Sequence, residues 1–257
     1  MPNKELKTYQ KLSTIFYDLE LENQETSKLA LKFYLDYALN ANGPILEPMC
    51  GTGRFLIPIL QANLEIEGFD ASEHMLNALI EKYKYISDKK APVQKLFIQD
   101  FKSEKKYNLI FVPFGSWGLI TDIEQSKLCL KNMYNHLNIN GKLVLEIETI
   151  NSVPSTCGTE CFGAHTLNAS SKITINTITS YNAQTQIFKS LCNYKLIKNN
   201  IVTKTEEELF EQYLYKNNEL DEYLKESGFN NIQKFIDFKK SPAKDNNSAI
   251  IIYECTR

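Results

Sequence analysis

The sequence predicts an α/β fold in which a doubly wound, mostly parallel sheet ends in an antiparallel hairpin and carries an inserted antiparallel β subdomain. Three observations lead to this prediction. Apolar runs alternate with helical patterns between residues 43 and 150, which is typical of parallel sheets. Two-residue alternation from about residue 172 to 215 indicates antiparallel strands. Glycines at 51 and 53 lie between an apolar run and a helical segment, as at ligand-binding turns of such sheets.

The pattern divides the 257 residues into four parts, which we interpret as one domain with an insertion. Residues 1–42 form a helical cap, because apolar side chains recur there at spacings of three and four. Residues 43–150 form the core. Residues 151–215 form the antiparallel insertion, and residues 216–257 supply a helix and a hairpin that complete the core sheet.

The elements follow from periodicity, glycines and polar breaks. Residues 150–170 are rich in Ser, Thr, Cys, Gly and Asn, and we expect a loop there; a second polar loop is expected at 239–247. Strands are expected at 45–46, 64–69, 93–98, 107–113, 142–149, 232–238 and 248–255, and helices at 6–17, 26–40, 54–61, 71–83, 122–137 and 217–227.

Charge and composition exclude several classes of protein. The 29 basic residues nearly balance the 31 acidic ones, which argues against a nucleic-acid partner because such partners select a basic surface. The polar N-terminus has no apolar signal region and no stretch is long enough to span a bilayer, so we expect a cytoplasmic protein without a membrane partner. Six scattered cysteines fit reduced thiols. The oligomeric state stays open.

The turn after the first core strand favours a ligand with a positive charge. A dinucleotide-binding turn has a third glycine, but Leu56 stands in its place, and no Gly-Lys-Ser/Thr phosphate loop is present. Glu47 precedes the glycines, and its carboxylate suits an ammonium group better than phosphates. Asp70 ends the next strand 17 residues after Gly53, close to the spacing at which an acid binds ribose hydroxyls.

Glu47, Gly51 and Gly53 together read acid-x-x-x-Gly-x-Gly, which resembles the first motif of class I S-adenosylmethionine (SAM) dependent methyltransferases. Met49 departs from this motif, since a glycine is more usual there. The antiparallel insertion resembles that of the small-molecule N- and O-methyltransferases. The resemblance implies a Rossmann-like fold, SAM as cofactor, and in-line transfer of a methyl group to nitrogen or oxygen of a small molecule beneath the insertion.

The resemblance also implies roles for single residues. Glu47 would hold the methionine ammonium, Asp70 the ribose, and Asp100 with Phe101 the adenine. Two roles have structural alternatives: a polar strand end for Asp100, and packing for Tyr17. Asp70 could be a helix cap, although Ser72 could take that place. The predicted cofactor-binding set is Tyr17, Glu47, Met49, Gly51, Gly53, Arg54, Asp70, Ala71, Met75, Asp100, Phe101, Pro113 and Phe114.

The acceptor is expected beside the turn that follows the strand 107–113, because ligands lie at the carboxyl ends of parallel strands. Ser116 and Trp117 are the first candidates for shaping its pocket, since a tryptophan between two glycines is poorly placed for a core. His165 is a candidate general base, because imidazole titrates near neutrality. Cys157, Cys161 and His165 could bind zinc only with a fourth ligand, so no metal is expected.

Other functions remain as alternatives. A nucleic-acid or protein methyltransferase would need a basic surface around the site. A SAM-binding module without turnover would have no open acceptor pocket. An NAD-dependent oxidoreductase is the weakest rival. The acceptor's identity, the methylated atom and the use of a general base are left open.

Overall fold

The computed structural model describes residues 6–22, 24–242 and 248–257. Their main sheet runs β11-β10-β12-β5-β4-β1-β2-β3. The five strands β1 to β5 pair in parallel, whereas β12 is antiparallel to both β5 and β10. The predicted parallel sheet with an antiparallel end is therefore confirmed. Its strands are β1 (Ile45–Pro48), β2 (Ile66–Asp70), β3 (Val93–Lys95), β4 (Tyr107–Val112), β5 (Leu137–Glu148), β10 (Asn231–Ile236), β11 (Lys239–Pro242) and β12 (Ile250–Thr256).

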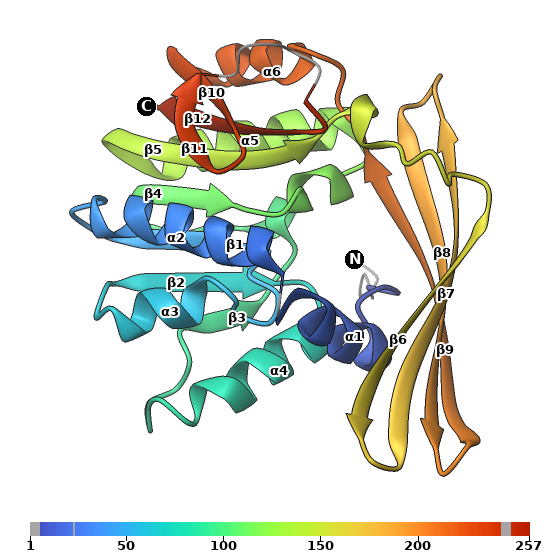
Figure 1. Cartoon of the computed structure of the whole chain (residues 1–257). Helices are drawn as coiled ribbons and strands as arrows, with labels where there is room; N and C mark the ends of the chain where they lie inside the picture. The colour runs from blue at the N-terminus through green and yellow to red at the C-terminus, as the bar shows by residue number, and fades with distance from the viewer. Residues whose placement is uncertain (1–5, 23, 243–247) are drawn as a thin grey trace.

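Helices cover both faces of this sheet (Figure 1). One core cluster joins the sheet to α5 and α6 through buried side chains such as Met133 and Leu220. The other cluster joins it to α2, α3 and α4 through Tyr34, Ile59 and Leu79. Apolar faces on both sides make the sheet doubly wound, as predicted. The helices are α2 (Glu25–Leu39), α3 (Leu56–Gln61), α4 (Glu73–Tyr83), α5 (Ile123–His136) and α6 (Glu219–Ser227). None of the helices described is long and apolar enough to cross a membrane.

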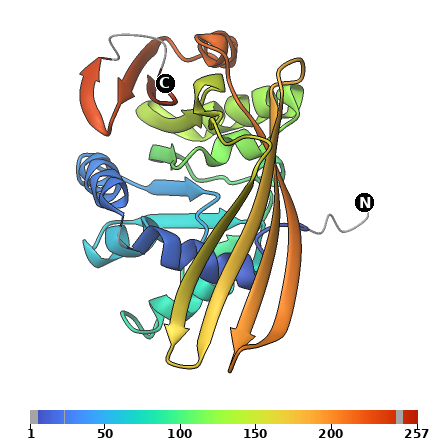
Figure 2. The same ribbon diagram turned by 45° about the vertical axis from the view of Figure 1, so that its right-hand side comes forward.

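A second, four-stranded sheet contains β6 (Glu160–Asn168), β7 (Ser171–Asn182), β8 (Ile187–Lys198) and β9 (Ile201–Tyr213). Each strand is antiparallel to the next. In Figures 1 and 2 this inserted sheet stands opposite the carboxyl ends of the parallel strands. The predicted loop at 150–170 is wrong in its second half, which forms β6. Its inward-facing residues include Gly163 and His165, so the strand lacks the apolar alternation that identifies β-structure.

Helix α1 (Lys11–Glu22) lies between the two sheets (Figure 1). On one side, Leu12 and Phe16 pack in a cluster with Ile173 of the inserted sheet. On the other side, the Asp18 carboxylate pairs with Lys82 of α4 at 2.8 Å. Helix α1 thus contacts both the insertion and the core.

Several element boundaries differ from prediction. Strand β3 ends at Lys95, since a short 3-10 turn (Ile98–Asp100) follows it. Strand β5 begins at Leu137, directly after α5, because the Asn140 N–H bonds to the Arg257 carbonyl beside the sheet and does not end a helix. The predicted loop at 239–247 begins with a strand, β11, and residues 243–247 lie outside the described part.

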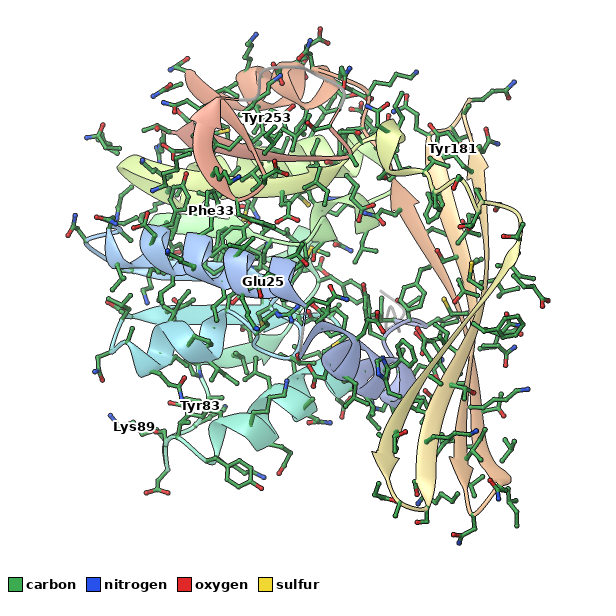
Figure 3. All side chains as sticks on the ribbon, viewed as in Figure 1. Glu25, Phe33, Tyr83, Lys89, Tyr181 and Tyr253 are labelled. Carbon is green, nitrogen blue, oxygen red and sulfur yellow. The ribbon has the colours of Figure 1, made fainter. Side chains whose placement is uncertain are left out.

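The C-terminal helix is fixed to the sheet by one carboxylate. Asp221 of α6 accepts a 2.8 Å hydrogen bond from the Tyr253 hydroxyl of β12 and pairs with Lys234 of β10 at 2.7 Å. Figure 3 shows Tyr253 in this part of the main sheet and Tyr181 at one end of the inserted sheet. Gly228 ends α6 with φ +109°, a left-handed conformation that glycine adopts without strain.

Candidate functional site

A cavity of about 560 Å³ lies between the carboxyl ends of the parallel strands and β9 of the inserted sheet. Its size falls within the range of small-molecule sites. One end adjoins the glycine turn, and the other adjoins β9 and the end of β5. The N-terminal segment closes part of it. The lining residues are Leu6, Thr8, Tyr9, Tyr17, Met49, Gly51, Asp70, Ala71, Met75, residues 96–99, residues 114–116, residues 119–122, Gln125, Glu148 and residues 209–212.

The two glycines of the turn have different structural roles. Gly51 has φ +51° and lines the cavity, and a Cβ added there would meet no atom within 4 Å. Gly53 has φ +80°, and a Cβ there would lie 2.7 Å from Leu79 of α4. Of the two glycines that a ligand was predicted to approach, the structure brings Gly51 to the cavity lining but not Gly53. Its lack of a side chain lets the turn pack against α4.

Asp70 joins this turn to the end of β2. One carboxylate oxygen accepts from the Gly51 N–H at 2.9 Å and the other from the Ser72 N–H at 2.8 Å. Burial raises the pKa of Asp70, and these N–H donors oppose that rise. The Ser72 hydroxyl accepts from the Met75 N–H at 3.1 Å and caps α4. Asp70 is therefore available to the cavity, which it lines.

Glu47 is a buried carboxylate that lacks a full set of partners. Its side chain is 1% exposed, and its Oε2 has no hydrogen-bond partner within the described residues. Burial, reinforced by the charge of Asp70, holds the pKa of Glu47 well above its usual value, while the Leu56 N–H opposes this. Buried polar atoms are nearly always hydrogen-bonded. An oxygen left free beside the cavity turn fits a cationic ligand group, although Glu47 itself is outside the lining set.

Tyr17 and Phe114 line the cavity, whereas Arg54 lies behind them. Burial raises the pKa of Tyr17 to about 12. The Arg54 guanidinium lies 5.1 Å from the centre of the Phe114 ring and donates to the Leu21 carbonyl. Arg54, predicted to contact the cofactor, is not among the lining residues, and its observed contacts hold α1 beside Phe114.

The structure does not bring Asp100 and Phe101, the residues predicted to contact adenine, to the cavity lining. Asp100 is exposed, and Phe101 is buried against Phe69 with ring centres 4.9 Å apart. Neither lines the cavity; residues 96–99 do. The cause is local, because the chain leaves β3 at Lys95 and turns before it reaches Asp100. Gln99, one position earlier in the sequence, is the polar residue of this segment that lines the cavity.

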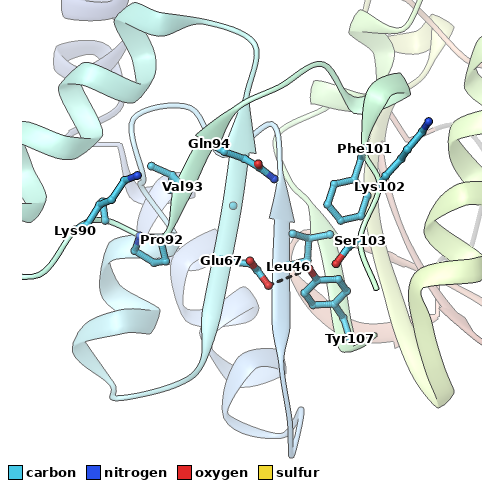
Figure 4. A pocket seen from close by; sticks show the side chains of 12 residues that line it. Leu46, Glu67, Lys90, Pro92, Val93, Gln94, Phe101, Lys102, Ser103 and Tyr107 are labelled. Carbon is cyan, nitrogen blue, oxygen red and sulfur yellow. Dashed lines mark hydrogen bonds between the residues drawn. The ribbon is translucent and has the colours of Figure 1, made fainter. Parts of the chain in front are cut away.

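A second, shallower depression of about 370 Å³ lies beside β2 and β3 (Figure 4). Phe101 lines it, and the Tyr107 hydroxyl donates to Glu67 across it at 2.9 Å. The same Glu67 carboxylate pairs with Lys105 at 2.8 Å. This depression shares no residue with the main cavity, and its one lining carboxylate, Glu67, is already paired. The main cavity is therefore the candidate site.

The turn after β4 brings Ser116 to the cavity but directs its neighbours elsewhere. Trp117 is fully buried, and its indole N–H donates to the Ser126 hydroxyl at 2.8 Å. The prediction that Trp117 shapes the acceptor pocket is thus wrong, because α5 provides a partner for its polar atom within the core. Pro113 is likewise buried and outside the lining set.

His165 also lies away from the cavity. Its Nε2 is 2.7 Å from the Glu20 carboxylate of α1, and its ring packs on Phe16. The predicted general base is therefore a contact between β6 and α1. Across the described residues no group of three His, Cys, Asp or Glu side chains is placed to hold a metal ion, and the zinc alternative has no support.

The N-terminal segment is the feature that sequence reasoning missed. Tyr9 and Gln10 donate their N–H groups to the Glu208 carboxylate at 2.6 and 3.2 Å, and the Leu12 N–H donates to Glu206 at 2.5 Å. The Ser72 hydroxyl donates to the Tyr9 carbonyl at 2.7 Å. Two carboxylates of β9 thus satisfy the free N–H groups that begin α1. The acidic run 206–208 in an alternating strand was the available signal.

Residues 46–143 match the model of a protein family described as a methyltransferase domain. The chain contains a methyltransferase domain. The predicted resemblance to class I methyltransferases is confirmed, and the matched residues include the glycine turn and Asp70. A search of curated protein sequences gave no match.

Solved structures resemble this methyltransferase over nearly its whole length. A SAM-dependent methyltransferase from Clostridium acetobutylicum has a TM-score of 0.78 at 18% identity, covering 96% of this chain and 98% of that one. The sugar N-methyltransferase KedS8 from a Streptoalloteichus species has a TM-score of 0.74 at 13% identity, covering 100% and 98%. SAM-bound CalS10 from Micromonospora echinaspora, an amino pentose methyltransferase, has a TM-score of 0.69 at 12% identity, covering 98% and 99%. At these identities the likeness shows a shared fold that includes the inserted sheet.

Proposed function

We propose that this methyltransferase moves a methyl group from SAM to a nitrogen or oxygen atom of a small molecule. One observation carries the proposal. A single cavity extends from the glycine turn and Asp70 to Glu148 and Gln212 at the inserted sheet. Within a methyltransferase domain, this arrangement gives one end to the donor and the other to the acceptor.

The residues at the glycine turn suit a sulfonium nucleoside. Asp70 would accept hydrogen bonds from the ribose hydroxyls, and the free oxygen of Glu47 would hold the ammonium group. Met75 and residues 96–99 would lie beside the adenine, with Tyr17, Met49, Gly51, Ala71 and Phe114 completing the site. Among the lining residues that the structure describes, none is Lys, Arg or His, which disfavours the pyrophosphate of a dinucleotide.

Methyl transfer from SAM depends more on the alignment of donor and acceptor than on acid–base groups of the protein. SAM supplies a methyl group that is already activated on a positive sulfur. The turn at 113–116 and the Glu148 side chain would hold the acceptor in line, while β9 and Tyr9 would keep water out. Positioning of this kind can lower a barrier by about 7–11 kcal/mol. A catalytic triad is therefore not needed.

The inserted sheet supports a small acceptor. Residues of β9 close the cavity opposite the strand ends, so the space between them admits a small molecule better than a macromolecule. Two structural neighbours with the same insertion are named as a sugar N-methyltransferase and an amino pentose methyltransferase. We propose that the insertion, at residues 151–215, covers the acceptor in this chain too.

Calorimetric titration of the purified protein with SAM, S-adenosylhomocysteine and NAD tests the donor. We expect saturable binding of the first two and none of NAD. Incubation with SAM labelled in its methyl group, followed by a screen of small amines and alcohols, then tests transfer. Binding of NAD alone, or no binding of any of the three, would refute the proposed function.

A further inference from the structure

The end of the cavity away from the glycine turn has a one-sided charge. Glu148 lies there, Asp122 lines the same cavity, and none of the described lining residues is Lys, Arg or His. Glu211 also borders the cavity, but its carboxylate pairs with Lys189 of β8 at 2.6 Å and is neutralised by it. The acceptor end therefore carries negative charge without a bound counter-charge from the protein.

Among the carboxylates that line the cavity, Glu148 lies beside Gly115 in the turn after β4. A Cβ built on Gly115 would lie 3.1 Å from the Glu148 Oε1 and 3.2 Å from the Gln212 Nε2. The Gln212 amide donates weakly to the Gly115 carbonyl at 3.4 Å. No hydrogen bond or ion pair to the Glu148 carboxylate occurs within residues 6–22, 24–242 and 248–257, so its oxygens are free to bind an acceptor.

Asp122 is less available than Glu148. One of its oxygens accepts from the Gln125 N–H at 3.0 Å and so caps α5. It is also exposed, whereas Glu148 is half-buried beside Gly115 and Gln212. A charge in the less hydrated position interacts more strongly with a bound ligand. Glu148 is therefore the stronger candidate for direct contact.

We propose that the acceptor is a protonated amine that bears hydroxyl groups and no phosphate, and that Glu148 binds its ammonium group. This inference rests on the proposed methyl transfer and names the acceptor's chemical class. The hydroxyl groups would bond to polar side chains that line the same cavity, among them Ser116 and Gln212 beside Gly115. A phosphate would meet Glu148 and Asp122 with no cation to offset the repulsion.

The position of Glu148 also suits the chemistry of an amine acceptor. The ammonium first loses one proton, to Glu148 or to water, and exposes a nitrogen lone pair. That pair forms the N–C bond while the S–C bond breaks and its electrons stay on sulfur, which leaves a neutral thioether. The positive charge thus moves from sulfur to nitrogen. A carboxylate beside the nitrogen stabilises this charge as it develops.

The test uses the full chain saturated with S-adenosylhomocysteine and three matched probes: glucosamine, glucose and glucosamine 6-phosphate. Saturation-transfer NMR and calorimetry would measure the binding of each. We expect glucosamine to bind at least about tenfold more tightly than either of the others. The Glu148→Gln variant keeps the shape of the side chain and should lose this preference. Glu207→Gln is the matched control, because Glu207 lies on the same strand as Gln212 but is exposed and bonds to Asn193.

The outcomes separate this inference from the proposed function. If the chain binds S-adenosylhomocysteine but shows no preference for glucosamine, or binds the phosphorylated sugar best, the amine assignment is refuted while methyl transfer stands. If Glu148→Gln keeps the preference, Glu148 is not the binding group. Loss of the preference in both variants would point to a general change in the protein and would also refute the assignment. Failure to bind S-adenosylhomocysteine would instead refute the proposed function.

Discussion

The two ends of the cavity are assembled in different ways. At the donor end, Gly51 and Asp70 come from neighbouring strand ends, and a hydrogen bond joins them directly. At the acceptor end, Glu148 and Gln212 are far apart in sequence and meet only because β9 folds back over the core. A tight turn requires particular residue types at a few adjacent positions, so it can be recognised as a motif in the sequence. A surface assembled from distant strands imposes no such local pattern.

The largest expected effect is at the donor end. Asp70→Ala removes the proposed ribose contact and also the acceptor of the Gly51 N–H. We expect affinity for SAM to fall about 100-fold, equivalent to about 2.7 kcal/mol. Calorimetry measures the affinity, and circular dichroism checks that the fold is retained. Unchanged affinity in a folded variant would make the ribose assignment wrong and would remove the distinction between the two ends.

The glycines offer a comparison within the donor end. Gly53→Ala places a Cβ against Leu79 at φ +80°, and we expect it to lower the free energy of unfolding by about 2–3 kcal/mol. Gly51→Ala adds only the strain of φ +51°, about 1 kcal/mol, but its methyl group projects into the cavity. Denaturant unfolding and SAM titration of both variants would separate stability from binding. Equal losses of stability would contradict the two roles.

Glu146 supports the turn after β4, which lines the cavity between its two ends. The Phe114 N–H and the Tyr34 hydroxyl donate hydrogen bonds to the Glu146 carboxyl group. Burial raises its pKa from 4.5 to about 7. Ionisation is thus disfavoured in the folded state, and stability is lost as pH rises from about 4.5 through 7. We expect Glu146→Gln to gain about 3 kcal/mol over the unmodified chain above this range and little below it.

Thermal unfolding across this pH range measures the difference for Glu146→Gln, with the exposed Glu207→Gln as control. A constant difference at every pH would show that Glu146 stays ionised in the folded protein. The turn after β4 would then be held by hydrogen bonds to an ionised carboxylate.

A smaller effect is expected where the inserted sheet holds the N-terminal segment. Glu208→Gln keeps one of the two oxygens that accept from Tyr9 and Gln10. We expect the start of α1 to open more easily by about 1 kcal/mol. Hydrogen exchange at the Leu12 amide would report this opening, and SAM should also dissociate faster, since Tyr9 lines the cavity. Faster exchange without faster dissociation would show that this segment does not retain the donor.

The smallest expected effect concerns SAM affinity and distinguishes the adjacent residues Gln99 and Asp100. Asp100 is exposed outside the cavity, so Asp100→Ala should change SAM affinity by less than about twofold. Gln99 lines the cavity, and Gln99→Ala should weaken binding about fivefold, the value of one hydrogen bond. Calorimetry of the pair decides between them. A large effect confined to Asp100→Ala would restore the sequence-based assignment of adenine binding.

The sequence predicted the fold because local patterns specify it. Alternating apolar runs gave the parallel sheet, and Gly51 with Asp70 located the donor end. The missed features depend on tertiary contacts. Trp117, between two glycines, is predicted to be poorly placed for a core, but Ser126 of α5 provides a hydrogen-bond partner for its indole within the core. His165 looked like a free base until Glu20 of α1 paired with it. The capping of α1 by Glu206 and Glu208 joins residues almost 200 positions apart, which no local pattern reveals.

A crystal structure of the protein with S-adenosylhomocysteine tests the central claim most directly. The account predicts the ribose hydroxyls on Asp70, the amino-acid end beside Glu47, and the sulfur directed along the cavity toward Gly115 and Glu148. A nucleoside bound in the depression beside Glu67 and Tyr107, or one whose sulfur points away from Glu148, would contradict it.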